Sequence, residues 1–109
     1  MVKPAHLEVA MTAYVILDID VKDQATYAHY VAKAPATVTA YGGKYLARAG
    51  RTEKLEGEWV PKRLVILQFD SLERAQEWLN SPAYAPVKAL RHKAAHSNIV
   101  VIEGAPNVP

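Results

Sequence analysis

Three polar side chains near the end of the sequence have the spacing of one side of a helix. Tyr84, Lys88 and Arg91 stand at positions i, i+4 and i+7, beside the apolar residues of the same segment. A phenol there can exchange a proton with a ligand, and a guanidinium can hold a carboxylate or enolate oxygen through paired hydrogen bonds. Tyr84 and Arg91 are therefore our candidate catalytic residues. The structural alternative is that Tyr84 caps the core and Arg91 pairs with a nearby carboxylate or carbonyl.

Two further arginines interrupt stretches that otherwise have the pattern of β-strands. Arg48 and Arg63 each stand among β-branched, aromatic and aliphatic residues. We predict that both are ligand-binding residues and meet an anionic ligand in the same cleft. The alternative left open is that each forms a salt bridge with a nearby aspartate or glutamate.

Four aromatic side chains fall on the apolar stripes of the predicted helices: Tyr27, Tyr30, Tyr41 and Trp78. Aromatic rings at such positions usually pack in the core, with the hydroxyl or indole group bonded nearby, but they can also stack on a planar ligand. We carry Tyr30 and Trp78 forward as candidate ligand-binding residues, together with Asn98 near the start of the last predicted strand. The alternative for Asn98, and for Ser97 before it, is that they cap and turn the chain.

Two histidines have the i, i+4 spacing that metal sites use on helices. His92 and His96 lie in and after the same predicted helix as Arg91. However, His92 falls on the solvated side of that helix, where basic residues complement the negative carboxyl-terminal end. His29 likewise falls opposite most of the apolar stripe of its helix, and no histidine is placed as an axial ligand for haem. We therefore predict no metal and no bound cofactor.

Length and composition point to a single small domain. The chain has 109 residues, a formal net charge of +2 and no cysteine, which excludes a disulfide scaffold, a thiolate metal site and a cysteine nucleophile. The small basic excess is spread evenly and does not favour nucleic acid or an anionic membrane as a partner. No apolar run approaches the length of a membrane span or a signal peptide. We expect a soluble cytoplasmic protein.

Hydrophobic patterns predict four strands, the second of them interrupted by a bulge at Gly50. The predicted strands are 13–19, 44–49 resuming at 52–55, 63–69, and 98–103. A helix follows Asp23, with a kink or break expected at Pro35. Asp70 and Glu73 resemble a capping box that opens a second helix, and Ser81 starts a single turn before a third helix at 86–95.

In this third helix, we expect a buried stripe formed by Ala83, Val87, Leu90 and Ala94. Residues 1–12 are expected to be an extension, residues 105–109 a tail, and residues 13–104 the domain.

The order strand, helix, strand, strand, helix, strand predicts a ferredoxin-like α+β sandwich with βαββαβ topology. The strand at 63–69 is so apolar that it must be central, and both it and the strand at 98–103 place aliphatic residues on both faces of the sheet. Helices can cover only one face. We therefore predict a homodimer in which an identical sheet covers the other face. The alternative is a monomer in which the hairpin at 52–59 or the amino-terminal segment lies across the sheet.

Four segments together are characteristic of a known family: Tyr41-Gly42-Gly43-Lys44-Tyr45-Leu46-Ala47-Arg48, Glu56-Gly57-Glu58-Trp59, Leu64 to Phe69 with Ser71, and Trp78 followed by Ser81-Pro82-Ala83-Tyr84. With them the chain resembles the bacterial family named domain of unknown function 1330, within the dimeric α/β-barrel superfamily. The resemblance covers about residues 13–104. It implies a homodimeric α/β barrel built from two ferredoxin-like sandwiches, and it supplies no established reaction.

The resemblance extends to several candidate site residues. Ser81, Tyr84 and Arg91 match the motif positions of the family, and the family pattern includes an arginine at positions 48 and 63. Relatives in the wider superfamily include cofactor-free antibiotic-biosynthesis monooxygenases, haem-degrading enzymes and lactone isomerases. Fold-level kinship of this kind does not transfer a reaction.

Two functional hypotheses follow. In the first, a small enzyme binds a planar or enolisable anionic metabolite between sheet and helices, with Tyr84 moving a proton and Arg91 or Arg48 stabilising charge; monooxygenase, isomerase and lyase chemistry without a cofactor are all compatible. In the second, a non-catalytic homodimer binds a ligand or a partner. An RNA-recognition domain with the same element order is excluded, because the central strand Leu64 to Phe69 lacks the exposed aromatic residues that stack on bases.

Overall fold

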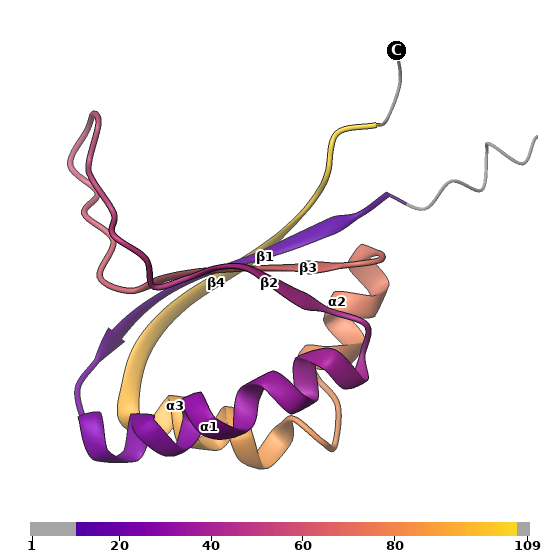
Figure 1. The fold of residues 1–109 in the computed structure, drawn as a ribbon, viewed down its shortest axis with the longest axis horizontal. Coiled ribbons are helices and arrows are strands. Elements are labelled where there is room, and N and C mark those ends of the chain that lie inside the picture. The colour runs from indigo at the N-terminus through magenta and orange to yellow at the C-terminus, as the bar shows by residue number, and fades with distance from the viewer. Residues whose placement is uncertain (1–10, 107–109) are drawn as a thin grey trace, which may run out of the picture.

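The computed structural model describes residues 11–106 and shows an antiparallel four-stranded sheet with helices packed against one face (Figure 1). The elements are β1 (Ala13–Val21), α1 (Gln24–Ala40), β2 (Lys44–Arg48), β3 (Leu64–Phe69), α2 (Leu72–Leu79), α3 (Ala85–Ala94) and β4 (Ala95–Glu103). The strand order is β2-β3-β1-β4, so β3 and β1 are central. The fold is a ferredoxin-like α+β sandwich, and this prediction is confirmed.

The core lies between the sheet and the helices. Alternate residues of β1 and β3 point toward the helices and are buried, as expected for strands with a side-chain period of two: Ala13, Val15, Leu17, Ile19, Val65, Leu67 and Phe69. Trp78 and Tyr84 are the largest fully buried side chains on the helical side. Their rings pack with centroids 4.3 Å apart, which places a polar hydroxyl and an indole N–H inside an otherwise apolar layer.

Helix α1 begins where the sequence predicted. Asp23 is its N-cap, and its carboxylate accepts a hydrogen bond from the backbone N–H of Thr26. The helix continues through Pro35 to Ala40, so the predicted break is wrong: proline removes one backbone donor, but the buried stripe on both sides holds the two halves in one helix.

The connection from α1 into β2 depends on a glycine pair. Gly42 has φ of +77°, which a residue with a β-carbon rarely adopts. Gly43 is needed for space instead, since a β-carbon there would lie 2.5 Å from Cε1 of Phe69 and 2.9 Å from Cγ1 of Val38.

Strand β2 is shorter than predicted. It ends at Arg48, its bulge lies between Tyr45 and Ala47 instead of at Gly50, and residues 52–55 are not in a strand. We call the segment 49–63 the arm; its two ends are bonded to the sheet, and the part between them rises on the side opposite the helices (Figure 1). Alternation alone predicted a strand there, but residues 51–60 are exposed and have no neighbouring strand to pair with in the described chain.

The ends of the last two helices partly correct the sequence analysis. The N-cap of α2 is Ser71, whose hydroxyl accepts from the N–H of Arg74, so the capping box at Asp70 is wrong by one residue. Ser81 accepts from the N–H of Tyr84 in a single turn before α3, as predicted. Of the predicted stripe, Val87 and Ala94 are buried and Leu90 is half-buried, but Ala83 lies in the turn before α3 and is exposed.

Strand β4 starts at Ala95, three residues earlier than predicted. His96 therefore lies in the strand while His92 lies in α3, and the two histidines do not form a pair on one helix. The helix stops there because the extended conformation lets residues 95–103 pair with the whole length of β1.

The face of the sheet opposite the helices carries an apolar row. Ala47, Ile66, Ile16 and Val100 are successive cross-strand partners from β2 to β4. Beside them Ile102 is 57% exposed, and Val100 itself is 59% exposed. We call this surface the open face. It confirms that the helices cover only one side of the sheet (Figure 1).

The arm does not cover the open face, contrary to one form of the monomer alternative. It is tied to the sheet at its base, where Asp18 accepts hydrogen bonds from the indole N–H of Trp59 at 2.9 Å and the backbone N–H of Lys62 at 2.9 Å. Leu55 beyond this contact is exposed, and Trp59 stays mostly exposed although its indole N–H is bonded. The amino-terminal segment, the other proposed cover, falls mostly outside the described residues. Within residues 11–106 there is no helix with the length and apolar character to span a membrane.

Candidate functional site

A chain of polar groups runs through the core beneath the sheet. The hydroxyls of Tyr30 on α1 and Tyr84 before α3 are 2.7 Å apart, and Nε of Arg91 donates to the Tyr84 hydroxyl at 3.4 Å. Tyr84 is 0% exposed and Arg91 is 2% exposed. The structure thus brings together the two candidate catalytic residues, but it buries both; Tyr84 contacts the hydroxyl of Tyr30, and Tyr30 lines a cavity beneath the sheet.

Burial determines the protonation of this chain. Removal from water raises the pKa of Tyr30 far above its ordinary value, and the neighbouring Tyr84 hydroxyl raises it further. Tyr30 is therefore a neutral phenol at every physiological pH. It can donate a hydrogen bond to a ligand, but it does not act as an anionic base.

The cavity beside Tyr30 lies between α1 and the strands β1, β2 and β3. Its walls combine the aliphatic face of the sheet with three tyrosines and two arginines: Tyr27, Tyr30, Tyr45, Arg48 and Arg63. Its volume of about 10 Å³ is room for about one water molecule. A metabolite does not fit unless side chains at its rim move.

Arg63 separates this cavity from a larger hollow at the surface. Its Nε donates to the hydroxyl of Tyr27 at 3.1 Å, and its guanidinium lies 5.2 Å from the centre of the same ring. Ile19, Tyr27 and Arg63 line both spaces, and the outer hollow of about 250 Å³ adds Gln24 and Lys62. We call the inner cavity and the outer hollow together the α1 cleft.

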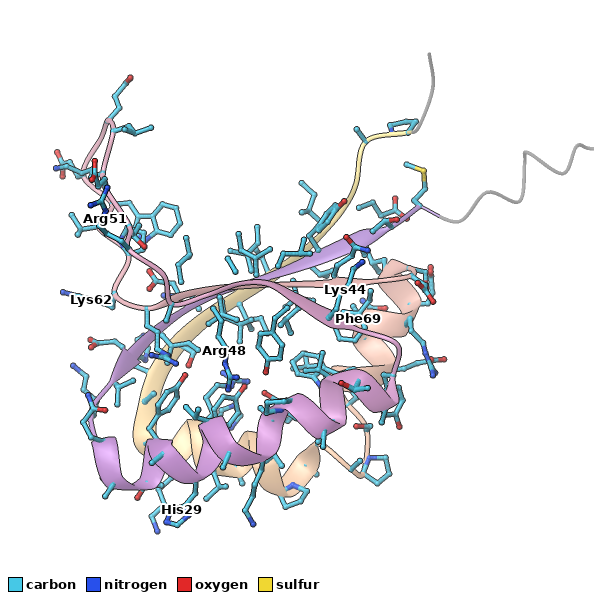
Figure 2. The ribbon with its side chains drawn as sticks, in the orientation of Figure 1. His29, Lys44, Arg48, Arg51, Lys62 and Phe69 are labelled. Carbon is cyan, nitrogen blue, oxygen red and sulfur yellow. The ribbon has the colours of Figure 1, made fainter. Side chains whose placement is uncertain are left out.

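Arg48 closes the other rim of the cavity. Figure 2 shows its side chain extending from the sheet toward α1, where Nη2 donates to the carbonyl oxygen of Val31 at 2.8 Å. The guanidinium also lies 4.7 Å from the centre of the Tyr45 ring. Burial raises the pKa of the Tyr45 hydroxyl, which keeps that group a neutral donor beside the cation.

The arginines of the cleft have no carboxylate partner in the described part of the chain. The salt bridges found there are Lys22–Asp20, Arg51–Glu53 and Arg74–Glu77, all exposed. Arg48 and Arg63 are instead held by a carbonyl, a phenol and two ring faces. Within residues 11–106 of one chain, neither Arg48 nor Arg63 forms a salt bridge, and a bridge to an acidic residue at the seam of a barrel stays a prediction.

The remaining predicted site residues lie elsewhere. Trp78 is buried under α1 and donates its indole N–H to Thr37 at 3.1 Å. Asn98 is exposed on the open face, paired with Asp18 of β1. His29 is exposed on α1, and Figure 2 shows it on the side away from the sheet. The structure thus groups Tyr30, Arg48 and Arg63 and separates them from Trp78 and Asn98; their functional roles stay predictions.

Three residues of the cleft were not among our candidate site residues. Tyr27 was interpreted as core packing with stacking as an alternative, and Tyr45 and Lys62 were not singled out. A signal was present for Lys62, because a Lys-Arg pair directly before the most apolar strand is unusual. Nothing in the sequence indicated Tyr45, whose direction depends on the bulge in β2. In residues 11–106, no three side chains of the types that ligate metals come together.

The fold defines the class first: this is a ferredoxin-like α+β protein, with a cationic, tyrosine-lined cleft between its sheet and first helix. The chain belongs to the family described as Domain of unknown function (DUF1330), whose sequence profile matches residues 12–105. A search of curated proteins gave no significant match.

Solved structures with low sequence identity share this fold. RPA0582 of Rhodopseudomonas palustris, a protein of unknown function, superimposes with a TM-score of 0.71 at 16% identity, over 87% of this chain and 83% of that one. SnoaB of Streptomyces nogalater, a cofactor-independent oxygenase, gives a TM-score of 0.62 at 13% identity over 92% and 99% of the two chains. A protein of unknown function from Bacteroides thetaiotaomicron, described as a possible oxidoreductase, gives 0.55 at 12% identity over 88% and 99%.

Proposed function

We propose that this protein binds a small planar anion in the α1 cleft. The observation that supports the proposal most directly is the composition of the cleft: Arg48, Arg63 and Lys62 line it together with three tyrosines, and neither aspartate nor glutamate is among its lining residues. Cations without counter-ions at an apolar cavity are the usual arrangement for recognising a carboxylate, enolate or phenolate.

The anion is expected to displace Arg63 from Tyr27. In the structure Nε of Arg63 donates to a neutral phenol, which is a weaker partner than a carboxylate. Exchanging the two partners frees the hydroxyl and the ring face of Tyr27 for the ligand. Lys62 at the outer hollow adds a second positive charge without further rearrangement.

The apolar part of the ligand is expected to enter the inner cavity once Arg48 swings outward. Arg48 is exposed, and its tie to the Val31 carbonyl is a single surface hydrogen bond of about 1 kcal/mol. Leu17, Val65 and Leu67 form the apolar floor on which a planar ring can lie. A ring is favoured over a flexible chain because the neighbouring tyrosines present aromatic faces.

A second candidate function is catalysis on the bound anion without a cofactor. The likeness in fold to SnoaB, a cofactor-independent oxygenase, favours it, and so does the neutral Tyr30 phenol at the inner wall of the cavity. In that role Tyr30 donates a hydrogen bond to oxygen on which negative charge develops, while Tyr84 and Arg91 hold the phenol in place. The cleft provides no carboxylate or imidazole among its lining residues to act as a general base, so a substrate that is already anionic suits it best.

Binding can be measured with 3-hydroxy-2-naphthoate, a fluorescent planar carboxylate. Arg63→Gln should weaken binding about 10- to 100-fold, the equivalent of the 1.5–3 kcal/mol of a hydrogen bond to a charged group. Lys33→Gln, which removes one charge from the exposed side of α1, is the matched control and should leave affinity within about twofold. Equal weakening by both variants would show that net charge, not the cleft, attracts the probe.

We propose further that a second copy of the chain covers the open face to form a homodimer. The support is the apolar row from Ala47 to Val100, which is wider than the scattered exposed residues of monomers. A twofold arrangement lets the same patch serve both partners. The arm, which carries the exposed Leu55 and Trp59, rises on that side of the sheet (Figure 1), where we expect it to contact the partner.

Light scattering tests the homodimer directly. The wild type should give a mass of about twice 12.0 kDa. Val100→Asp should give the monomer at micromolar concentration, because two unpaired carboxylates would be buried near the twofold axis. Ala32→Asp on the exposed side of α1 is the control and should stay dimeric. A wild-type mass of one chain would refute this arrangement.

A further inference from the structure

A second hollow lies at the opposite side of the core from the α1 cleft, between α3 and the edge strand β4. Its volume is about 470 Å³, and Lys88, Arg91, His92 and His96 are among its lining residues. Burial and the charges of Arg91 and Lys88 lower the pKa of His92, so the lasting positive charges are those of Lys88 and Arg91. Its lining residues include no aspartate or glutamate. Lys88 and Arg91 give this hollow a positive charge, and the nearest carboxylate shown is that of Asp20, the cross-strand partner of His96.

Arg91 is the unusual member of this group. It is 2% exposed, and its recorded hydrogen bond, from Nε to the Tyr84 hydroxyl, is long at 3.4 Å. No salt bridge reaches it within residues 11–106. A buried guanidinium without a counter-ion is costly, so an anion in the hollow would provide what the described protein atoms do not.

Ser97 adds a second, independent observation in the wall of the same hollow. Its Oγ is the buried side-chain polar atom that lacks a hydrogen-bond partner in the described part of the chain. Such groups are rare, because an unmade buried hydrogen bond costs about 1–3 kcal/mol. A ligand oxygen beside Arg91 would give this hydroxyl a partner.

The basic hollow continues into an apolar one. A neighbouring space of about 130 Å³ between α2 and β4 shares Leu79 and Ile99 with it. The residues that line this second space are almost all apolar, with Trp78 and Val101 among them. A ligand seated across both spaces would have a negative head and an apolar body. We call the two spaces together the β4 groove.

We propose that the β4 groove binds an amphipathic carboxylate, a short aliphatic chain with one carboxylate at its end. The carboxylate lies against Arg91, Lys88 and the Ser97 hydroxyl, and the chain runs over Leu79 and Ile99 into the apolar space. This site shares no lining residue with the outer hollow of the α1 cleft and does not depend on the function proposed for that cleft.

Octanoate is the probe for this proposal, with acetate and 1-octanol as matched ligands that lack the chain or the charge. Calorimetry should show octanoate binding at one site per chain and at least tenfold tighter than either control. In an amide NMR spectrum the largest shifts should fall on residues 88–99. Equal affinity for acetate and octanoate, or shifts centred on the open face at Ile66 and Val100, would overturn the proposal.

Variants locate the head and the chain separately. Lys88→Gln and Arg91→Gln should each weaken octanoate at least fivefold, and Leu79→Asn should weaken octanoate while leaving acetate unchanged. Lys93→Gln, the neighbouring exposed base on α3 that does not line the hollow, should change affinity less than twofold. If melting curves show that Arg91→Gln does not fold, the affinities of Lys88→Gln and Leu79→Asn for octanoate test the proposal instead. Equal weakening by Lys88→Gln and Lys93→Gln would refute the site.

The two sites can fail independently. Arg63→Gln should leave octanoate binding within twofold, and Lys88→Gln should leave the naphthoate probe within twofold. If the wild type does not bind naphthoate, only the binding site proposed in the α1 cleft is refuted. If the wild type does not bind octanoate, only the binding site proposed in the β4 groove is refuted.

Discussion

The buried pair Tyr30–Tyr84 gives the sharpest test of the polar chain in the core. Tyr84→Phe keeps the ring but removes the hydroxyl that contacts both Tyr30 and Arg91, at 2.7 Å and 3.4 Å. The substitution leaves the Tyr30 hydroxyl and the Arg91 guanidinium without this hydrogen-bond partner. Each unpaired buried group lowers the free energy of unfolding by about 1–3 kcal/mol when no other partner replaces the lost one. We expect a loss of about 2–3 kcal/mol in the free energy of unfolding. Tyr30→Phe leaves the Tyr84 hydroxyl bonded to Arg91, so we expect a loss of only about 1 kcal/mol.

The double variant is expected to be about as stable as Tyr84→Phe alone. Once the Tyr84 hydroxyl is gone, replacing Tyr30 removes an unpaired group instead of a hydrogen bond, which gives a coupling energy of about 1 kcal/mol. Urea unfolding at one fixed protein concentration measures all four proteins. Tyr41→Phe is the control, since the Tyr41 hydroxyl makes no hydrogen bond within residues 11–106, and should change stability by less than about 0.5 kcal/mol. Effects that add within about 0.3 kcal/mol would contradict a shared network.

Three further changes test the local structure around the site. Gly43→Ala should lose about 2 kcal/mol of stability because its β-carbon overlaps a buried ring, whereas Gly50→Ala, with nothing within 4 Å, should be close to neutral; similar losses at both would contradict the packing argument. Ser71→Ala should lower the free energy of unfolding by about 1 kcal/mol and Asp70→Ala clearly less, as measured by urea unfolding; a larger loss from Asp70→Ala would mean that Asp70 caps α2 instead. Asp18→Ala should release the base of the arm and raise the rate of trypsin cleavage there severalfold; an unchanged rate would mean that these bonds do not hold it.

The sequence predicted the fold well because its main signals are periodic. The short apolar runs of β1 and β3, the stripe of α1 and the Asp23 cap each depend on neighbours a few residues away, and the structure confirms these elements. The errors arise where pairing with a strand distant in the sequence determines the secondary structure. Residues 52–55 alternate like a strand, but no strand pairs with them. Ala95 continues a helical pattern, but pairing with Val21 of β1 draws it into β4 instead.

The candidate site was only partly predictable for the same reason. Arg48 and Arg63 stood out because a charge within an apolar strand pattern is a local signal, and the structure places both at one cavity. Tyr45 joins them only because the bulge in β2 fixes which way its side chain faces. Arg91 was identified by its spacing from Tyr84, but its burial follows from packing of α3 against α1, which no short-range pattern shows.

The most direct test of the central claim is a crystal structure of the protein with 3-hydroxy-2-naphthoate bound. We expect the carboxylate within hydrogen-bond distance of the Arg63 guanidinium, Arg63 turned away from Tyr27, and the ring system lying on the floor formed by Val65 and Leu67. A complex in which Arg63 still bonds to Tyr27 and the naphthoate lies outside the α1 cleft would contradict the account.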